Sequence, residues 1–128
     1  MSGRDMARFG LLYEREGCWR DQQIVPADWV EASGQIQKAV PYDPVAGYGL
    51  MWWIPSGPLQ KHGTYLASGS GSQSIIIAPE LDIVFVHRAT ADLGRGVNGL
   101  QVREILLRLI DAQTEPAVDQ PQLVPLSE

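Results

Sequence analysis

Two apolar runs joined by a short turn constrain the fold more than any other feature of this sequence. Residues 73–78 (QSIIIA) are followed by PELD at 79–82, and residues 83–88 (IVFVHR) come directly after. Runs rich in β-branched residues on both sides of a proline-containing turn predict an antiparallel hairpin. Because IVFV is apolar at every position, we expect the second strand to be covered on both faces and to have neighbours on both edges.

The rest of the pattern predicts helices around this hairpin. Ser2 and Asp5 have capping-box spacing at the start of a helix that ends at Gly17, and Pro26 opens a second helix. The further elements are a loop over 33–46, strands over 47–54 and 65–69, and an amphipathic helix over 100–112 with apolar positions at Val102, Ile105, Leu106, Leu109 and Ile110. The order predicts an α+β fold, an antiparallel sheet of three to four strands flanked by helices.

The composition is typical of one domain followed by a short tail. With 128 residues, 45% of them hydrophobic, the chain suffices for a single core, which we place in residues 1–113. Residues 114–128 carry three prolines in a polar stretch, and we expect a disordered tail there. The net charge of −5 argues against nucleic acid and anionic membranes as partners, since both select basic surfaces.

Several motifs that suggest cofactors or metals lack the context that they require. GRGVNG at 94–99 matches G-x-G-x-x-G, but no second parallel strand follows it, as a dinucleotide-binding unit needs. Cys18 is the single cysteine of the sequence, and His62 and His87 have no second ligand at metal-binding spacing. We therefore expect no cofactor and no metal site, and the sequence leaves the cellular compartment open.

Five stretches occur in an order that resembles the C-terminal half of the serine β-lactamase-like hydrolases. They are SGRDMARFG, IVPADWV, GYGLMWW, the hairpin ASGSGSQSIIIAPELDIVFVHR and the final amphipathic helix, and they span residues 2–112. The family includes class C β-lactamases, DD-peptidase-related and penicillin-binding-protein-like proteins, esterases and 6-aminohexanoate-oligomer hydrolases. The resemblance implies part of the β-lactamase/transpeptidase-like fold, and ester or amide hydrolysis through an acyl-enzyme.

Two catalytic motifs of that family do not occur in this sequence. The family's serine and lysine lie in an S-x-x-K motif, and a Y-x-N motif supplies a further acid or base. Here the lysines are Lys38 and Lys61, with Gln35 and Pro58 three residues before them, and no tyrosine has an asparagine two positions later. The resemblance therefore implies that this chain has no catalytic residue of its own and is inactive alone.

The third family motif, K-T-G or a relaxed version of it, lies on a strand beside the substrate. Counting back from the hairpin turn, the resemblance places Ala67, Ser68 and Gly69 on this strand and the N–H of Ser70 as an oxyanion-hole donor, worth about 3 kcal/mol of barrier. Gly69 and Gly71 are expected to supply unusual backbone dihedrals. Ala67 replaces the lysine of K-T-G, which favours ester or amide substrates over β-lactams. Without the resemblance, ASGSGSQ is typical of a glycine-rich entry to a strand.

The strand that begins at Ile83 and ends at Arg88 is also where we expect partner contacts. In the family fold two N-terminal strands pair with it, so the resemblance implies an edge for a second copy or a complementing chain. The first function we expect is that of a C-terminal fragment of a serine hydrolase, acting on a small ester or amide when completed. The alternative is a non-catalytic assembly or binding module derived from this fold. Its packing anchors would be Trp19, Trp29, Trp52 and Trp53.

Overall fold

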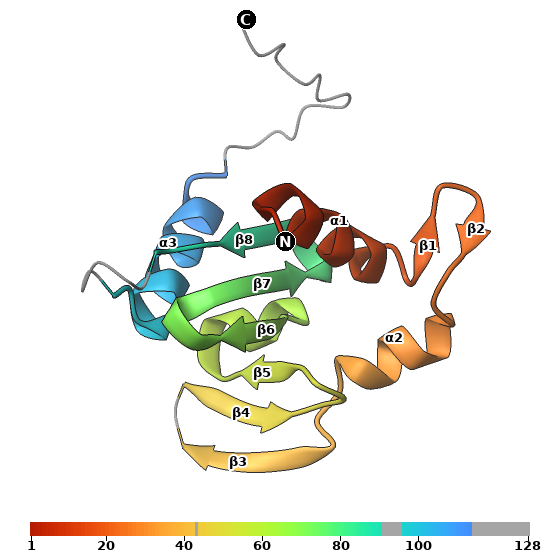
Figure 1. Ribbon diagram of the computed structural model, residues 1–128. Coiled ribbons are helices and arrows are strands. Elements are labelled where there is room, and N and C mark those ends of the chain that lie inside the picture. Colours follow the sequence, from red (N-terminus) through yellow and green to blue (C-terminus); the bar gives the residue numbers. More distant parts are fainter. Residues whose placement is uncertain (43, 91–95, 114–128) are drawn as a thin grey trace, which may run out of the picture.

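The protein is built on a six-stranded antiparallel sheet with one helix on each face (Figure 1). The computed structural model describes residues 1–42, 44–90 and 96–113. The helices are α1 (Gly3–Glu14), α2 (Ala27–Ser33) and α3 (Gly99–Asp111), and a hairpin of β1 (Cys18–Trp19) and β2 (Gln22–Gln23) links the first two. The sheet contains β3 (Lys38–Tyr42), β4 (Val45–Tyr48), β5 (Trp53–Pro55), β6 (Tyr65–Gly69), β7 (Gln73–Ala78) and β8 (Ile83–His87), in this spatial order.

The expected α+β architecture is confirmed, but the expected number of strands is wrong. The sheet has six strands and not three to four, and every strand pair within the described residues is antiparallel. The hairpin that the two apolar runs predict is present as β7 and β8, in unbroken register from Ser74↔His87 to Ala78↔Ile83.

The two additional strands lie in segments for which the prediction from the sequence was wrong. The stretch 33–46, expected to be a loop, contains β3, which lies at the edge of the sheet. Pro41 is tolerated there because an edge strand leaves one row of N–H groups without ladder partners. The stretch 47–54, expected to be one strand, reverses direction between β4 and β5. The Gly49 N–H donates to the Trp52 carbonyl (2.7 Å), and Met51 has a φ of 68° in this turn.

Helix α1 begins as the sequence predicts and packs more closely than it predicts. The Ser2 hydroxyl accepts from the Asp5 N–H (3.2 Å) and the Asp5 carboxylate accepts from the Ser2 N–H (3.0 Å), which completes a capping box. The buried residue of the helix is Gly10, which lies against Val84 of β8 and Ile75 of β7. A glycine at the contact lets the helix backbone approach the sheet directly.

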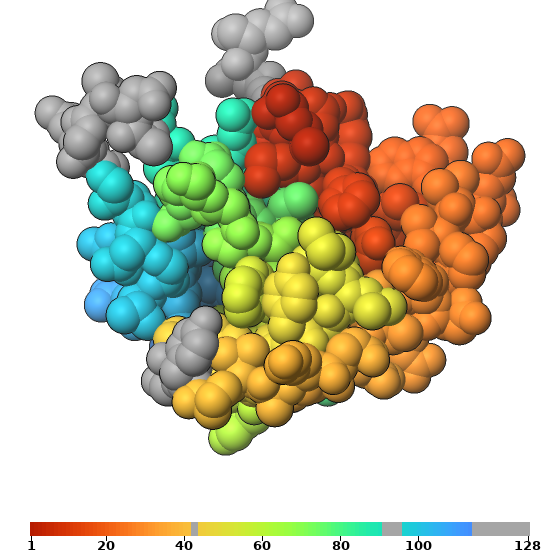
Figure 2. Space-filling model, turned by 60° about the horizontal axis from the view of Figure 1, so that its bottom comes forward, coloured from red at the N-terminus to blue at the C-terminus, as the bar shows by residue number. Residues whose placement is uncertain are grey.

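Alternate residues along the central strands divide the core into two layers. Ile75 and Ile77 of β7 pack with α1, and Ile76 packs with Val102 and Leu106 of α3. The α1 layer contains Trp52, Ile54, Tyr65, Ile75 and Ile77 with Met6, Tyr13 and Ala67 against them. The α3 layer contains Leu59, Ile76, Val102 and Leu106 with Leu66, Ile83 and Phe85 against them. In Figure 2 the blue α3 and the red α1 lie on opposite sides of the strands.

Helix α3 buries a narrower apolar stripe than its sequence pattern predicts. Val102 and Leu106 are buried, whereas Ile105 and Leu109 are 43% and 50% exposed. On the exposed face, Arg108 Nε lies 2.9 Å from Glu104 Oε1 in an i,i+4 ion pair. None of the helices in the described ranges is long and apolar enough to cross a membrane.

Strand β8 is covered on both faces but paired on one edge within the described chain. Val84 lies against α1, and Ile83 and Phe85 pack in the α3 layer. All five of its residues are half-buried. Within the described ranges β8 pairs with β7 and forms the end of the sheet, so the second neighbour expected for it is not found there. The expected tail at 114–128 and the first glycine of GRGVNG lie outside the described residues.

Candidate functional site: the open edge of β6

The strand that carries the predicted site residues is paired along one edge and largely free along the other. On one side β6 pairs with β7 at five successive positions, from Tyr65↔Ile77 to Gly69↔Gln73. On the other side, within the described chain, it pairs with β5 at Trp53↔Leu66 alone. Ala67, Ser68 and Gly69 therefore present an unpaired backbone edge, and Ser68 and Gly69 are exposed. An extended segment laid along this edge could form ladder hydrogen bonds with it.

The turn after β6 uses left-handed backbone at two positions. Gly71 has a φ of 71° and a ψ of 20°, and Ser72 has a φ of 58°. The expectation of unusual dihedrals is thus confirmed for Gly71 and wrong for Gly69, which is extended with a φ of −116° and a ψ of 174°. Ser70 is exposed and follows the last ladder pair, so its main chain lies just beyond the paired part of the hairpin.

Hydrogen bonds from three segments hold this turn in place. The Ser72 hydroxyl donates to the Val97 carbonyl before α3, and the Gln73 side-chain amide donates to the Ala89 carbonyl after β8. Nδ1 of His87 lies 2.8 Å from the Ser72 carbonyl oxygen. His87 is the last residue of β8, so the turn is anchored on the side opposite to the open edge of β6.

A cavity of about 340 Å3 lies between α3 and the strands next to this edge. Its apolar wall includes Trp53, Leu59, Leu66, Ile76 and Val102. Its polar lining comes from Ser68 of β6, Ser74 of β7 and Arg103 of α3. The cavity therefore starts at the predicted substrate strand and runs along the α3 face of the sheet.

The guanidinium of Arg103 in this cavity has a hydrogen-bond donor without a partner. Its Nη2 donates to the Ser56 carbonyl over a long 3.4 Å, and its buried Nε has no hydrogen-bond partner. The ion pairs among the described residues are Arg8–Asp5 and Arg108–Glu104, so no carboxylate of the described chain neutralises Arg103. An arginine stays charged at any physiological pH, and a buried donor without a partner costs free energy.

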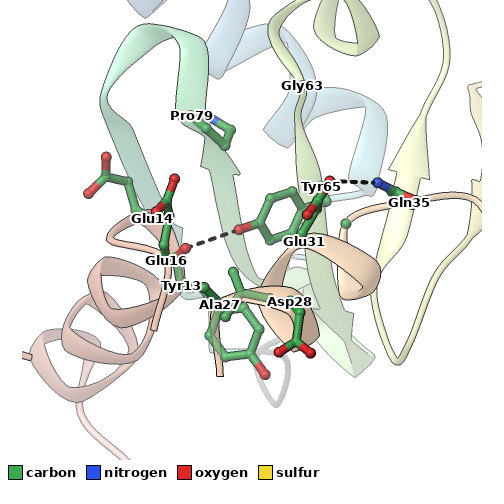
Figure 3. A pocket seen from close by; sticks show the side chains of 12 residues that line it. Tyr13, Glu14, Glu16, Ala27, Asp28, Glu31, Gln35, Gly63, Tyr65 and Pro79 are labelled. Carbon is green, nitrogen blue, oxygen red and sulfur yellow. Dashed lines mark hydrogen bonds between the residues drawn. The ribbon is translucent and has the colours of Figure 1, made fainter. Parts of the chain in front are cut away.

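A second cavity of about 440 Å3, at the start of β6, is acidic (Figure 3). The hydroxyl of Tyr65 lies across it and donates to the Tyr13 carbonyl (3.4 Å), and burial raises the pKa of this phenol above its usual value of 10.0. Four carboxylates line it, from Glu14, Glu16, Asp28 and Glu31. Negative side chains disfavour an oxyanion, so this end of β6 is unsuited to acyl transfer.

Trp52, just before β5, and Trp53, its first residue, lie on opposite faces of the sheet, as alternation along an extended chain predicts. Trp52 is 3% exposed and packs edge-on against Tyr65, with ring centroids 5.1 Å apart, whereas Trp53 lines the cavity below α3. Trp29, by contrast, is 52% exposed, so it does not act as a packing anchor within this chain. Within the described ranges no group of three or more histidine, cysteine or acidic residues is placed to hold a metal ion.

Comparison with known proteins finds similarity among solved structures. No family model matches the sequence, and no curated protein is similar to it. Among solved structures, the chain is similar to "Putative 6-aminohexanoate-dimer hydrolase from Bacillus anthracis", with a TM-score of 0.65 and 29% sequence identity. The match covers 85% of this chain and 27% of that chain.

This match supports a β-lactamase-like hydrolase fold for the chain. The six-stranded antiparallel sheet with helices on both faces lies within the 85% of the chain that the solved hydrolase matches. The chain spans 27% of the length of the solved hydrolase that it matches.

Sequence reasoning missed the cavity and its arginine. Arg103 follows Val102 in a helix whose exposed face carries Glu104 and Arg108, so its spacing is that of an ordinary surface residue. A signal was nevertheless present, since Arg103 directly follows a buried position and precedes the buried Leu106 by three residues. A side chain that borders the buried stripe of a helix can turn toward the core.

Proposed function

We propose that this chain supplies the substrate-lining strand of a serine hydrolase that cleaves esters or amides through an acyl-enzyme. The observation that carries the proposal is the open edge of β6 at Ala67, Ser68 and Gly69, on a strand whose other edge is fully paired. The match to a hydrolase at 29% identity supports the same reaction class. The S-x-x-K and Y-x-N motifs do not occur in these 128 residues, so the nucleophile and its base would come from other residues.

In this proposal each residue of the strand has a limited role. Ala67, Ser68 and Gly69 position the substrate through their backbone. The N–H of Ser70 stabilises the oxyanion of the tetrahedral intermediate, and the bonds of Ser72 and His87 keep the turn from moving as charge develops. Ala67 has no charge to offer a substrate carboxylate, which favours esters and amides over β-lactams.

The proposal extends to the partner that completes the enzyme. The edge strand β8, half-buried on both faces, is the surface along which a complementing chain or a second copy would add strands. A non-catalytic assembly module would use the same edge, and the two functions differ in whether completion of the sheet produces hydrolysis.

The first test is whether the purified chain hydrolyses p-nitrophenyl butyrate or reacts with a serine-directed phosphonate. We expect neither turnover nor an adduct in the mass spectrum, because no serine here has a lysine or tyrosine partner at the family spacing. A phosphonylated serine at 68, 70, 72 or 74 would show that the chain carries its own nucleophile and would overturn the proposal.

The second test is complementation with the matching hydrolase of Bacillus anthracis from which the equivalent 27% has been deleted. We expect mixing or co-expression to restore ester hydrolysis. Ser70→Pro in this chain removes the proposed N–H donor, and Gly69 before it already has the extended backbone that precedes proline. Loss of one oxyanion donor should lower kcat by about a hundredfold to a thousandfold. The matched variant Ser70→Ala keeps the N–H and should retain activity; equal loss in both variants would remove Ser70 from the site.

A further inference from the structure

We propose that the cavity below α3 binds an amphipathic monocarboxylate, with the carboxylate on Arg103 and the hydrocarbon part against the apolar wall. The inference rests on the cavity alone and holds whether or not the proposed acyl transfer does. No residue of this cavity other than Ser68 belongs to the strand edge proposed for the substrate.

The charge of the ligand follows from the state of Arg103. Its Nε is buried and without a partner, and its Nη2 makes one long bond of 3.4 Å to a carbonyl. No carboxylate among the described residues pairs with it, although the chain as a whole carries a net charge of −5. A guanidinium with donors to spare is matched by a planar anion that accepts two hydrogen bonds, which a carboxylate does.

The position of the guanidinium is fixed by its surroundings. It lies beside Ser56 and Gly57 at the end of β5, where a Cβ on Gly57 would come within 3.1 Å of Nη2. Gly57 has a φ of 69°, in the left-handed region that glycine adopts without strain. The glycine therefore keeps the room that the arginine occupies at one end of the cavity.

The apolar part of the ligand follows from the wall. Leu59, Ile76 and Val102 are all at most 3% exposed and close the cavity on its inner side, with Trp53 beside them. The Ser74 hydroxyl donates to the Ser72 carbonyl (3.3 Å), so it offers no free donor to a polar ligand. The part of the ligand that lies against the sheet is therefore expected to be hydrocarbon.

The volume sets the size of the ligand. At roughly 30 Å3 for a water-sized group, a cavity of about 340 Å3 holds on the order of ten heavy atoms. Octanoate has this size, and each methylene that enters the cavity should tighten binding by about threefold to fourfold. Ser68 lies at the exposed end, so a longer chain would extend past the open edge of β6.

The test is calorimetric titration of the chain with sodium octanoate and with octanamide, its neutral counterpart of the same length. Trp53 lines the cavity, so its indole N–H resonance should shift on binding. We expect octanoate to bind about tenfold to a hundredfold more tightly than octanamide, the range for hydrogen bonds to a charged group. Equal affinity for the two compounds, or no binding of octanoate at millimolar concentration, would overturn the proposal.

Three variants separate the roles of charge and cavity. Arg103→Gln should bring octanoate down to the affinity of octanamide, and retained octanamide binding will show that this variant is folded. Arg108→Gln, on the same helix but exposed and paired with Glu104, should bind octanoate as the parent chain does. Val45→Trp, which fills the cavity from β4, should abolish binding of both compounds. Unchanged octanoate affinity in Arg103→Gln or in Val45→Trp would place the ligand elsewhere.

Discussion

Replacement of Gly10 by alanine tests whether α1 fixes the sheet by direct backbone contact. A Cβ at this position would lie 2.5 Å from Cγ1 of Val84 and 2.9 Å from Cγ2 of Ile75. Both are γ-carbons of β-branched side chains, which have little rotameric freedom, and they sit on two neighbouring strands. The helix must therefore move outward, or both side chains must leave their rotamers.

The magnitude follows from two opposing effects. Overpacking of a core contact costs about 1–3 kcal/mol, and two simultaneous clashes favour the upper half of that range. Alanine gains about 1 kcal/mol over glycine in a helix interior. The net expectation is a loss of about 1–2 kcal/mol in the free energy of unfolding, or roughly 4 °C in Tm per kcal/mol.

Urea unfolding monitored by circular dichroism and by tryptophan fluorescence measures this change. Gly3→Ala is the matched control, since a Cβ there meets its nearest neighbour, Cδ of Arg88, at 3.7 Å. The double variant Gly10→Ala/Val84→Ala should be less destabilised than the sum of the single variants, because the second change removes the closest clash. A stabilised Gly10→Ala, or a strictly additive double variant, would refute the direct contact.

Three further predictions concern the ends of the helices and the turn of the site. Gly71→Ala should lower stability by about 1–2 kcal/mol, because a residue with a Cβ is strained at a φ of 71°, and Gly71→Asn should cost less; equal stability of both variants with the parent chain would contradict this. Asn98→Ala should cost about 1 kcal/mol in thermal unfolding by removing the cap of α3, whose side chain accepts from the Gln101 N–H (2.9 Å), whereas Asn98→Ser should keep the cap; a neutral alanine variant would argue against it. Burial, and after it the neighbouring Asp82 carboxyl, raises the pKa of Glu14 above its usual 4.5. The folded protein therefore favours the protonated form of Glu14. The stability that this preference contributes is fully present below pH 4.5 and is lost as the pH rises through the folded-state pKa. Glu14→Gln should therefore be more stable than the parent chain at neutral pH and similar to it at acid pH, and parallel pH profiles of the two urea midpoints would disprove the raised pKa.

The parts of the fold that the sequence predicts are those where one physical signal dominates. The β7–β8 hairpin combines strong β propensity with a turn, and the capping box of α1 needs only two residues at the right spacing. The failures lie where tertiary context overrides the local pattern. Pro41 suggests a loop, but an edge strand tolerates it, and the apolar run at 47–54 gives no sign of the reversal that Gly49 makes.

Gly49 shows why that reversal depends on a distant contact. A Cβ on Gly49 would lie 2.2 Å from the Ser33 carbonyl oxygen, so the turn between β4 and β5 packs against the end of α2. No local property of GYGLMWWI encodes this contact. This turn fixes the residue at which β5 starts. The start of β5 then limits how many residues of β6 can pair with β5.

The candidate site therefore depends more on how β5 pairs with β6 than on the residue types that form it. The sequence identifies Ala67, Ser68, Gly69 and Ser70 through a resemblance, and it places them on a strand. Whether their edge is available depends on β5, which is three residues long and meets β6 at Trp53↔Leu66. A longer β5 would cover the edge and leave no room for a substrate, although β6 itself would be unchanged. The space below α3, where no carboxylate of the described residues pairs with Arg103, also borders this strand at Trp53, so both proposed sites lie beside the short β5.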